Sequence, residues 1–182
     1  MRDRLRFRAA LCLAICAACG QRMSATVVVP ADFTTVVTDS GLIVHGRVVA
    51  VESHLVGPQR AIESVVSLAV IQTLKGDTRD IVSFRVPTGE VGRYRRVLVG
   101  APEFKSGDEV IVFLQGRAPS LPSVFGLNQG LYRVMRNGPR AMVMPPRMSA
   151  GEGRVVRGDP ARVPVPIDAF AREVGSVLER SR

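Results

Sequence analysis

The sequence of 182 residues has no tryptophan, and aromatic residues make up only 5% of it. A hydrophobic core with so few rings has to be built mainly from valine, leucine and isoleucine. These aliphatic residues, the β-branched ones above all, suit the pleated, half-buried surface of a sheet. With 46% hydrophobic and 23% charged residues, the chain has enough apolar material for one globular domain. We therefore expect a mainly β fold.

Cysteine and histidine are also scarce. The three cysteines, Cys12, Cys16 and Cys19, all lie near the N-terminus, and the rest of the chain has no thiol. A disulfide framework is therefore excluded for the remainder of the chain. A zinc site normally needs three or four ligands of the histidine, cysteine or carboxylate type. Since His45 and His54 are the only histidines, we expect no metal site and no cofactor, with His45 in a strand and His54 in the loop that follows.

Signatures of catalysis are missing as well. The chain has no Gly-x-Ser-x-Gly elbow, no Gly-x-x-x-x-Gly-Lys phosphate loop and no His-Glu-x-x-His helix. The adjacent acids Asp108 and Glu109 follow a Ser-Gly turn signal, so we expect solvated charges there rather than a glycosidase pair. No catalytic residue is predicted.

No apolar run in the chain reaches the roughly 20 residues of a membrane-spanning helix. Residues 1–8 are rich in arginine, residues 9–18 are apolar, and small residues follow, which is the order of a secretory signal peptide. We expect a signal peptide over residues 1–25, cleaved between residues 20 and 26, and a secreted or periplasmic protein without a transmembrane segment. Alternatively, Ala-Ala-Cys at 17–19 is typical of a lipoprotein signal, with lipid on Cys19 and anchorage to the envelope.

Nearly half of the formal charge of +9 lies in this leader, which holds five of the 25 basic residues and one of the 16 acidic ones. From Thr26 onward the chain has 20 basic and 15 acidic residues, a net charge of +5. A charge of this size suits solubility and does not by itself indicate a specific nucleic-acid partner.

Runs of β-branched and apolar residues, separated by glycine and proline, predict the strands of a β-rich domain over residues 26–144. The strands are expected at 42–52, 61–74, 80–86, 95–99 and 109–114, followed by a hairpin of 131–135 and 140–144 around Asn137-Gly138. The run 109–114 is too continuous for a surface strand and should be central. Gly46 marks a bulge or a close approach. The pattern predicts a single small barrel or sandwich.

Three segments outside the expected strands have a different character. Residues 30–40 form either a short N-terminal helix, with Asp32 near its first turn, or an irregular lead-in. Residues 145–166 are rich in proline and glycine and predict a loop or tether. Residues 167–182 predict a C-terminal amphipathic helix that packs on the domain or on a partner. Its apolar stripe consists of Ile167, Phe170, Val174, Val177 and Leu178.

The densest basic and aromatic cluster is Arg93, Tyr94, Arg95 and Arg96, between Pro87 and Pro102. Arginine forks bind phosphate or sulfate, and a tyrosine ring stacks on a base or a sugar. These four residues are the candidate anion-binding site. The alternative is that the arginines form a solvated edge that discourages aggregation between strands.

Four segments carry a resemblance to known proteins: LIVHGRVV at 42–49, VIQTLKG at 70–76, FKSGDEV at 104–110 and GLNQGLYRV at 126–134. Their order resembles a group of uncharacterised secreted bacterial proteins. It is also distantly similar to the five-stranded OB-type barrel of tissue inhibitors of metalloproteinases and netrin-like modules. Those inhibitors use an N-terminal cysteine held by disulfides. This chain has no cysteine after the leader, so the resemblance transfers no functional residue.

These observations predict an exported, non-enzymatic binding or interaction module. Its partner is an unknown protein or an anionic ligand of the envelope. The alternative function is an inhibitor or accessory factor of a secreted protease, and the third is a hydrolase without a recognisable signature. One barrel architecture hosts many functions, so the fold does not choose among them.

Overall fold

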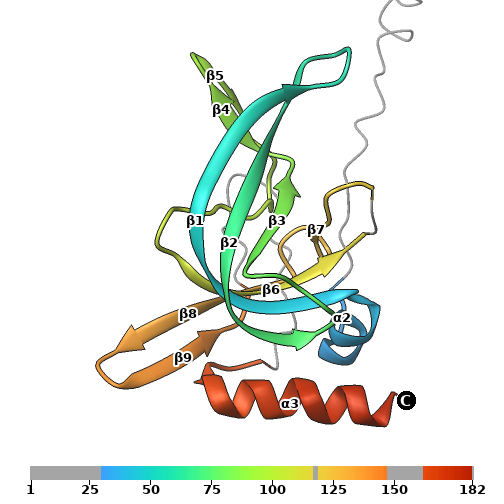
Figure 1. Cartoon of the computed structure of the whole chain (residues 1–182), viewed down its shortest axis with the longest axis vertical. Coiled ribbons are helices and arrows are strands. Elements are labelled where there is room, and N and C mark those ends of the chain that lie inside the picture. The colour runs from blue at the N-terminus through green and yellow to red at the C-terminus, as the bar shows by residue number, and fades with distance from the viewer. Residues whose placement is uncertain (1–29, 117–118, 147–161, 182) are drawn as a thin grey trace, which may run out of the picture.

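The computed structural model describes residues 30–116, 119–146 and 162–181 (Figure 1). The expected signal peptide, its cleavage site and Cys19 lie outside the described residues, as does most of the expected tether. The described helices are α2 (Phe33–Asp39) and α3 (Ile167–Arg180). The strands are β1 (Leu42–Val56), β2 (Ala61–Lys75), β3 (Ile81–Val86), β4 (Gly89–Val91), β5 (Tyr94–Arg96), β6 (Glu109–Gln115), β7 (Ser123–Val124), β8 (Leu131–Asn137), β9 (Arg140–Met144) and β10 (Val165–Pro166).

The expected small β fold is confirmed, and it is a closed barrel of five strands. Strand pairing runs β1-β2-β3-β7-β6, and β6 then pairs with β1 to complete the ring. The β3–β7 pair is parallel, whereas the other pairs of the ring are antiparallel. β8, β9 and β10 extend the sheet from β6 beyond the barrel. Closure leaves the five strands of the ring without an open edge within the barrel, which protects them from pairing with other chains.

β1 and β2 are long, curved strands that rise together from the barrel (Figure 1). The register of their pairing shifts between His45 and Gly46, which confirms the irregularity expected there. A Cβ atom at Gly46 would lie 2.4 Å from the carbonyl oxygen of Ala69, so only glycine fits. β1 continues to Val56 and includes His54, which pairs with Glu63. The assignment of His54 to a loop was wrong, because the hairpin ladder continues almost to the turn.

β6 is the central strand that its continuous apolar run predicts. It pairs with β1, β7 and β8, and every residue from Glu109 to Leu114 is buried. Since successive side chains of a strand point to opposite faces, β6 contributes to two cores. Val110, Val112 and Leu114 belong to the aliphatic core of the barrel. Ile111 and Phe113 belong to a second core on the outer face of the same strand.

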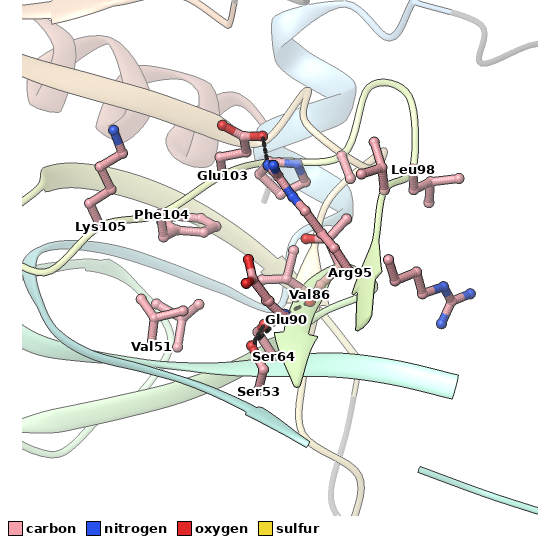
Figure 2. Close-up of a pocket in the computed structure, with 17 residues that line it drawn as sticks. Val51, Ser53, Ser64, Val86, Glu90, Arg95, Leu98, Glu103, Phe104 and Lys105 are labelled. Carbon is pink, nitrogen blue, oxygen red and sulfur yellow. Dashed lines mark hydrogen bonds and ion pairs between the residues drawn. The ribbon is translucent and has the colours of Figure 1, made fainter. Parts of the chain in front are cut away.

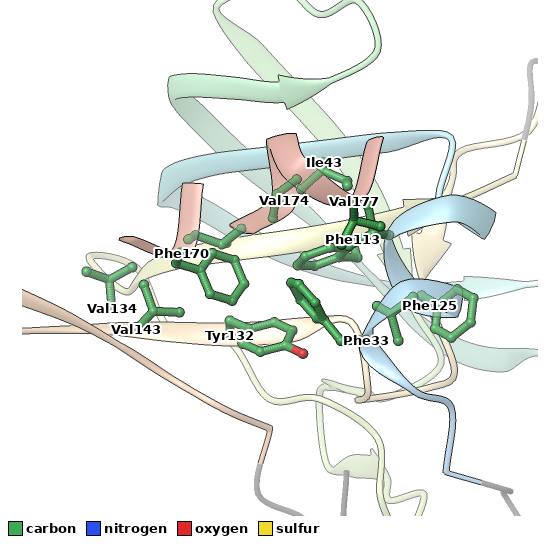
Figure 3. Close-up of a cluster of buried hydrophobic side chains, with 13 residues drawn as sticks. Phe33, Ile43, Phe113, Phe125, Tyr132, Val134, Val143, Phe170, Val174 and Val177 are labelled. Atoms are coloured by element: carbon green, nitrogen blue, oxygen red, sulfur yellow. The ribbon is translucent and has the colours of Figure 1, made fainter. Parts of the chain in front are cut away.

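The second core is covered by the two helices and is rich in aromatic rings (Figure 3). The ring of Phe33 in α2 lies 6.1 Å from that of Phe113 and 5.5 Å from that of Phe170, both in edge-to-face geometry. Tyr132 of β8 lies 4.9 Å from Phe170. α3 therefore packs on its own domain. Its expected apolar stripe is confirmed, with Phe170, Val174 and Val177 buried and Ile167 and Leu178 partly buried.

α2 forms where the sequence places a capping residue. Asp32 is the N-cap, and its carboxylate accepts a hydrogen bond of 2.7 Å from the backbone N–H of Thr35. At the other end, Lys75 Nζ donates to the carbonyl oxygens of Val37 and Thr38 at 2.9 and 2.8 Å. A lysine at this position satisfies carbonyls that have no partner within the helix. The short helix is thus fixed against the end of β2.

The β8–β9 hairpin is confirmed, but its turn differs from the expected one. Asn137 still belongs to β8 and pairs with Arg140, so the two turn residues are Gly138 and Pro139. Gly138 has φ +60°, and the proline ring holds φ negative at the next position. That combination is the pattern of a type II′ turn, which matches the twist of a hairpin. Proline excludes the type I′ turn that Asn-Gly would form.

The end of the segment 145–166, expected to be a loop or tether, is part of the sheet. Val165 and Pro166 form β10 and pair with Val143 and Met142 of β9. Just before β10, the guanidinium group of Arg162 lies 3.5 Å from the centre of the Phe33 ring. The same group donates two hydrogen bonds, of 2.9 and 2.8 Å, to the carboxylate of Glu173 in α3. Composition alone did not reveal these contacts.

Candidate ligand-binding cleft at the barrel end

The chain between β3 and β6 forms a cap on one end of the barrel. Pro87 stops β3 as expected, and the chain then forms the β4–β5 hairpin and a loop that leads to β6. The ring of Phe104 in that loop packs edge-on against Phe84 of the barrel core, with 5.2 Å between centroids. In Figure 1, β4 and β5 lie at the end of the molecule opposite α3.

Two serines hold the β4–β5 hairpin against β1 and β2 (Figure 2). Ser53 Oγ accepts a hydrogen bond of 3.1 Å from the backbone N–H of Glu90, and Ser64 Oγ donates one of 2.6 Å to the carbonyl of Thr88. The two hydroxyl oxygens lie 2.9 Å apart. A Cβ at Gly89 would lie 2.4 Å from Ser64 Oγ, so a glycine is needed where the hairpin meets the serines.

A cleft of about 340 Å³ lies between this cap and the β1–β2 ladder. Its apolar lining includes Val51, Val66 and Val86, one from each of the first three strands. Charged residues also line it: the basic Arg95, Arg96 and Lys105 and the acidic Glu90 and Glu103. The combination of an apolar wall with a few charged groups is typical of ligand pockets.

The structure divides the predicted arginine and tyrosine cluster between two places. Arg95 and Arg96 line the cleft, where Arg95 lies 3.7 Å from the carboxylate of Glu103 and Arg96 donates to the carbonyl of Ile62 at 3.2 Å. Arg93 and Tyr94 lie at the hairpin turn and contact each other, with the guanidinium 5.1 Å from the ring centre. All four side chains are exposed.

The expected strand at 95–99 is shifted. β5 covers Tyr94–Arg96, its partner β4 was not predicted, and the chain leaves the strand after Arg96. β4 escaped prediction because a three-residue strand that contains glycine has no measurable hydrophobic period. The β4–β5 pair forms a separate two-stranded sheet beside the barrel.

The expectation that Asp108 and Glu109 are both solvated was wrong for Glu109, which is only 8% exposed. One carboxylate oxygen lies 2.9 Å from His45 Nε2, and Arg136 donates to both oxygens, at 2.8 Å from Nε and 2.5 Å from Nη2. Arg47 donates at 3.2 Å. The Arg136 hydrogen bonds, and after them His45, lower the pKa of Glu109 to about 2. Glu109 is thus a buried, ionised carboxylate that binds Arg136 and His45.

The alternation of side chains along β1 and β6 could have indicated that Glu109 and His45 lie together. Glu109 is two residues before Ile111 and four before Phe113, and His45 is two after Ile43, so each lies on the face of the second core. His45 is thus a strand histidine satisfied by a neighbour, as expected. Asp108, on the opposite face, accepts a hydrogen bond of 2.8 Å from Arg133.

The described residues lack two features. Over residues 30–116, 119–146 and 162–181, no three histidine, cysteine or acidic side chains gather as a metal ion would require. No helix in that part of the chain has the length and hydropathy to cross a bilayer. His45 and His54 are on different parts of β1, and neither lines the cleft.

Comparison with protein-family models, curated proteins and solved structures found no match to this chain. The resemblance to uncharacterised secreted bacterial proteins and to metalloproteinase inhibitors therefore stays a prediction, as does the inhibitor function that depends on it. The barrel itself is observed, but nothing links it to those inhibitors.

Proposed function

We propose that this protein is an exported, non-enzymatic binding module whose ligand occupies the cleft at the barrel end. The arginine-rich and apolar start of the sequence supports export, either as a secreted or periplasmic protein or as a lipoprotein anchored through Cys19. The cleft supports binding, because it combines an apolar lining with exposed cations.

The binding proposal rests on the position of the Arg95 side chain. Its guanidinium points over the cleft toward Glu103 (Figure 2). The two groups are 3.7 Å apart and both are largely exposed, so their ion pair contributes little stability and is easily exchanged. A ligand carboxylate, sulfate or phosphate can replace Glu103 with a bidentate contact to the same guanidinium. We therefore propose a ligand that has an anionic group and an apolar part.

The lining of the cleft favours binding over hydrolysis. Both serines in it, Ser53 and Ser64, are hydrogen-bonded to the hairpin backbone and to each other. A serine nucleophile needs a general base within hydrogen-bonding distance. Neither histidine of the chain is among the residues that line the cleft. The hydroxyls are instead required to hold the cap.

Retention on heparin, a soluble polyanion, tests the proposal. We expect the wild type to bind at low salt and to elute early as salt rises, because its net charge is small and screening acts within about 8 Å at physiological salt. The triple variant R93S/R95S/R96S should lose retention, and its melting temperature should be nearly unchanged.

The matched control is R79S/R140S/R172S, which removes the same charge from exposed positions on the β2–β3 turn, the β8–β9 hairpin and α3. This control should elute close to the wild type. If the two triple variants elute together, retention reflects overall charge and the cleft is not the binding site.

Export has an independent test. Mass spectrometry of protein purified from its native source should show an N-terminus between residues 21 and 26, or a lipidated Cys19. Intact residues 1–20 on exported protein would contradict the proposed signal peptide.

A further inference from the structure

Directly after the arginine cluster, three consecutive aliphatic side chains face solvent. Val97 is 70% exposed, Leu98 is 41% exposed and Val99 is 65% exposed. Other large exposed hydrophobic residues occur in the described part of the chain, but no two of those are adjacent in sequence. Singly exposed aliphatic residues are ordinary on a protein surface, whereas a contiguous group marks an interaction site.

This apolar turn is held in place. The backbone N–H of Ala101 donates a hydrogen bond of 3.0 Å to the carbonyl of Leu98, and Gly100 has φ +82°. A glycine with positive φ at this position is the pattern of a type II turn. Immediately after it, Pro102 is buried and Phe104 packs on Phe84. The side chains of Val97 to Val99 are therefore presented to solvent by a segment that is anchored on the barrel core.

Basic and aromatic groups adjoin the apolar turn on its N-terminal side. Arg93 and Arg96 donate hydrogen bonds to neutral oxygens, those of the Tyr94 hydroxyl and the Ile62 carbonyl. In the described structure neither guanidinium forms an ion pair, so their positive charges are not neutralised. Tyr94 is 61% exposed. An arginine fork binds phosphate, and a tyrosine ring suits the boundary between headgroups and acyl chains.

We propose that the turn of Val97, Leu98 and Val99 inserts into the headgroup boundary of an anionic lipid bilayer while the arginines of β5 and its turn contact lipid phosphates. The inference shares these arginines with the proposed function and in that respect rests on it. Val97 and Leu98 also line the cleft, whereas Val99 does not. Figure 1 shows that the cap lies at the end of the molecule away from α3, so the helix does not obstruct the approach to a bilayer.

A bilayer suits this surface better than a protein partner does. A stable protein interface buries about 800 Å² on each side, far more than three aliphatic side chains supply. Peripheral attachment to a membrane needs only a small inserted apolar group together with attraction between basic residues and anionic lipid. The composition of the turn, with cations next to apolar side chains, matches that second requirement.

Vesicle sedimentation tests the proposal on the chain purified without its leader, residues 26–182. We expect binding to vesicles of phosphatidylcholine mixed with phosphatidylglycerol, and much weaker binding to vesicles of phosphatidylcholine alone. The variant V97S/V99S keeps every charge and should bind the mixed vesicles about tenfold more weakly, because two inserted side chains are lost.

The matched control is I71S/I81S, which removes two exposed aliphatic side chains from β2 and β3. It should bind the mixed vesicles like the wild type. Circular dichroism and melting curves check that both variants fold. Failure of the wild type to bind mixed vesicles would overturn the proposal. Unchanged binding by V97S/V99S would also overturn it, since charge alone would then explain attachment.

Heparin retention separates this inference from the proposed function. The single variant V99S should be retained on heparin like the wild type, because Val99 does not line the cleft and all arginines are intact. If the wild type binds mixed vesicles through Val97 and Val99 but is not retained on heparin, the proposal of an anion-binding cleft fails and the lipid proposal stands. If the wild type is retained on heparin but does not bind the mixed vesicles, the lipid proposal fails and the proposal of an anion-binding cleft stands.

Discussion

The two cores on either side of β6 differ in composition and in the way they are closed. The barrel core is almost wholly aliphatic, and Phe84 is its one fully buried aromatic side chain among the described residues. The outer core is built around Phe33, Phe113, Tyr132 and Phe170, and two helices cover it. A barrel interior is narrow, so small branched side chains fill it, whereas the space between a sheet and a helix accommodates rings.

The cores also differ in their dependence on distant parts of the sequence. The barrel core is made by strands between Leu42 and Leu131, and the ladder that closes it joins β1 to β6. The outer core needs Phe33 from α2 and Phe170 from α3, which are separated by nearly the whole described chain. The edge-to-face contacts of those rings therefore tie the two ends of the domain together.

The largest expected effect comes from removing a ring from the outer core. Phe113→Ala should lower the free energy of unfolding by about 3–5 kcal/mol, because the ring is fully buried against Phe33, Tyr132 and Phe170. Urea denaturation followed by circular dichroism measures this loss. Ile71→Ala on the exposed surface is the control and should change stability by about 0.5 kcal/mol or less. If the two variants lose a similar free energy of unfolding, Phe113 is not buried beneath the helices as described.

The next effect tests the barrel side of the same strand. Leu114→Ala should cost about 2–5 kcal/mol, since Leu114 is 1% exposed and lies in the barrel core with Val112. The same urea titration applies, and the near-UV signal of the outer aromatic rings should be retained below the transition. A loss under about half a kilocalorie would place this face of β6 at the surface.

A smaller effect concerns the charged border of the outer core, where Glu109 binds Arg136 and His45. The pKa of Glu109 is lowered to about 2 in the folded protein, so its contribution to stability is present above the ordinary value near 4.5 and is lost as pH falls toward 2. We expect Glu109→Gln to lose about 1–3 kcal/mol at neutral pH. Its stability should then fall less steeply than that of the wild type between those pH values.

Other carboxylates with lowered pKa, such as Asp32 and Asp168, contribute to acid sensitivity in both proteins. For that reason the measurement is the difference between the two pH profiles, obtained from urea titrations at each pH. Parallel profiles would show that the carboxylate of Glu109 is not stabilised by its partners.

The smallest expected effect is that of a reductant. No cysteine follows Cys19, so neither core contains a thiol to be oxidised. The melting temperature of the exported protein should be the same with and without dithiothreitol. A decrease of several degrees would mean that leader cysteines are retained and form a disulfide that stabilises the fold.

Local patterns predicted much of this fold. The apolar run of β6, the bulge at Gly46, the stop at Pro87 and the apolar stripe of α3 were all visible because each depends on neighbouring residues. The short strands β4, β7 and β10 were not predicted. Strands of two or three residues have too few positions to show a period, and their pairing depends on partners far along the chain.

The candidate site was predicted only in part. The arginine cluster was found by composition, but its division between the cleft and the hairpin turn follows from the β4–β5 pairing. The serine contacts to the hairpin were missed, since Ser53 and Ser64 are unremarkable in sequence and gain their role from Gly89, which lies more than 20 residues further on. The burial of Glu109 was missed because an acid beside a turn is usually solvated.

The sequence by itself determined that the chain forms a small aliphatic β domain followed by a C-terminal amphipathic helix, with all its cysteines in the first 19 residues. It left open whether residues 30–40 form a helix or an irregular lead-in. Composition and hydrophobic period are properties of each segment alone, so they can be read from the sequence without a structure. Only the tertiary structure decided that β1 and β6 close a barrel, that Arg162 lies on Phe33, and that the charge of Glu109 is buried. These features join residues that are far apart in the sequence, from 27 positions for Glu109 and Arg136 to more than 60 for Glu109 and His45. The free energy of such contacts depends on geometry that no local pattern contains.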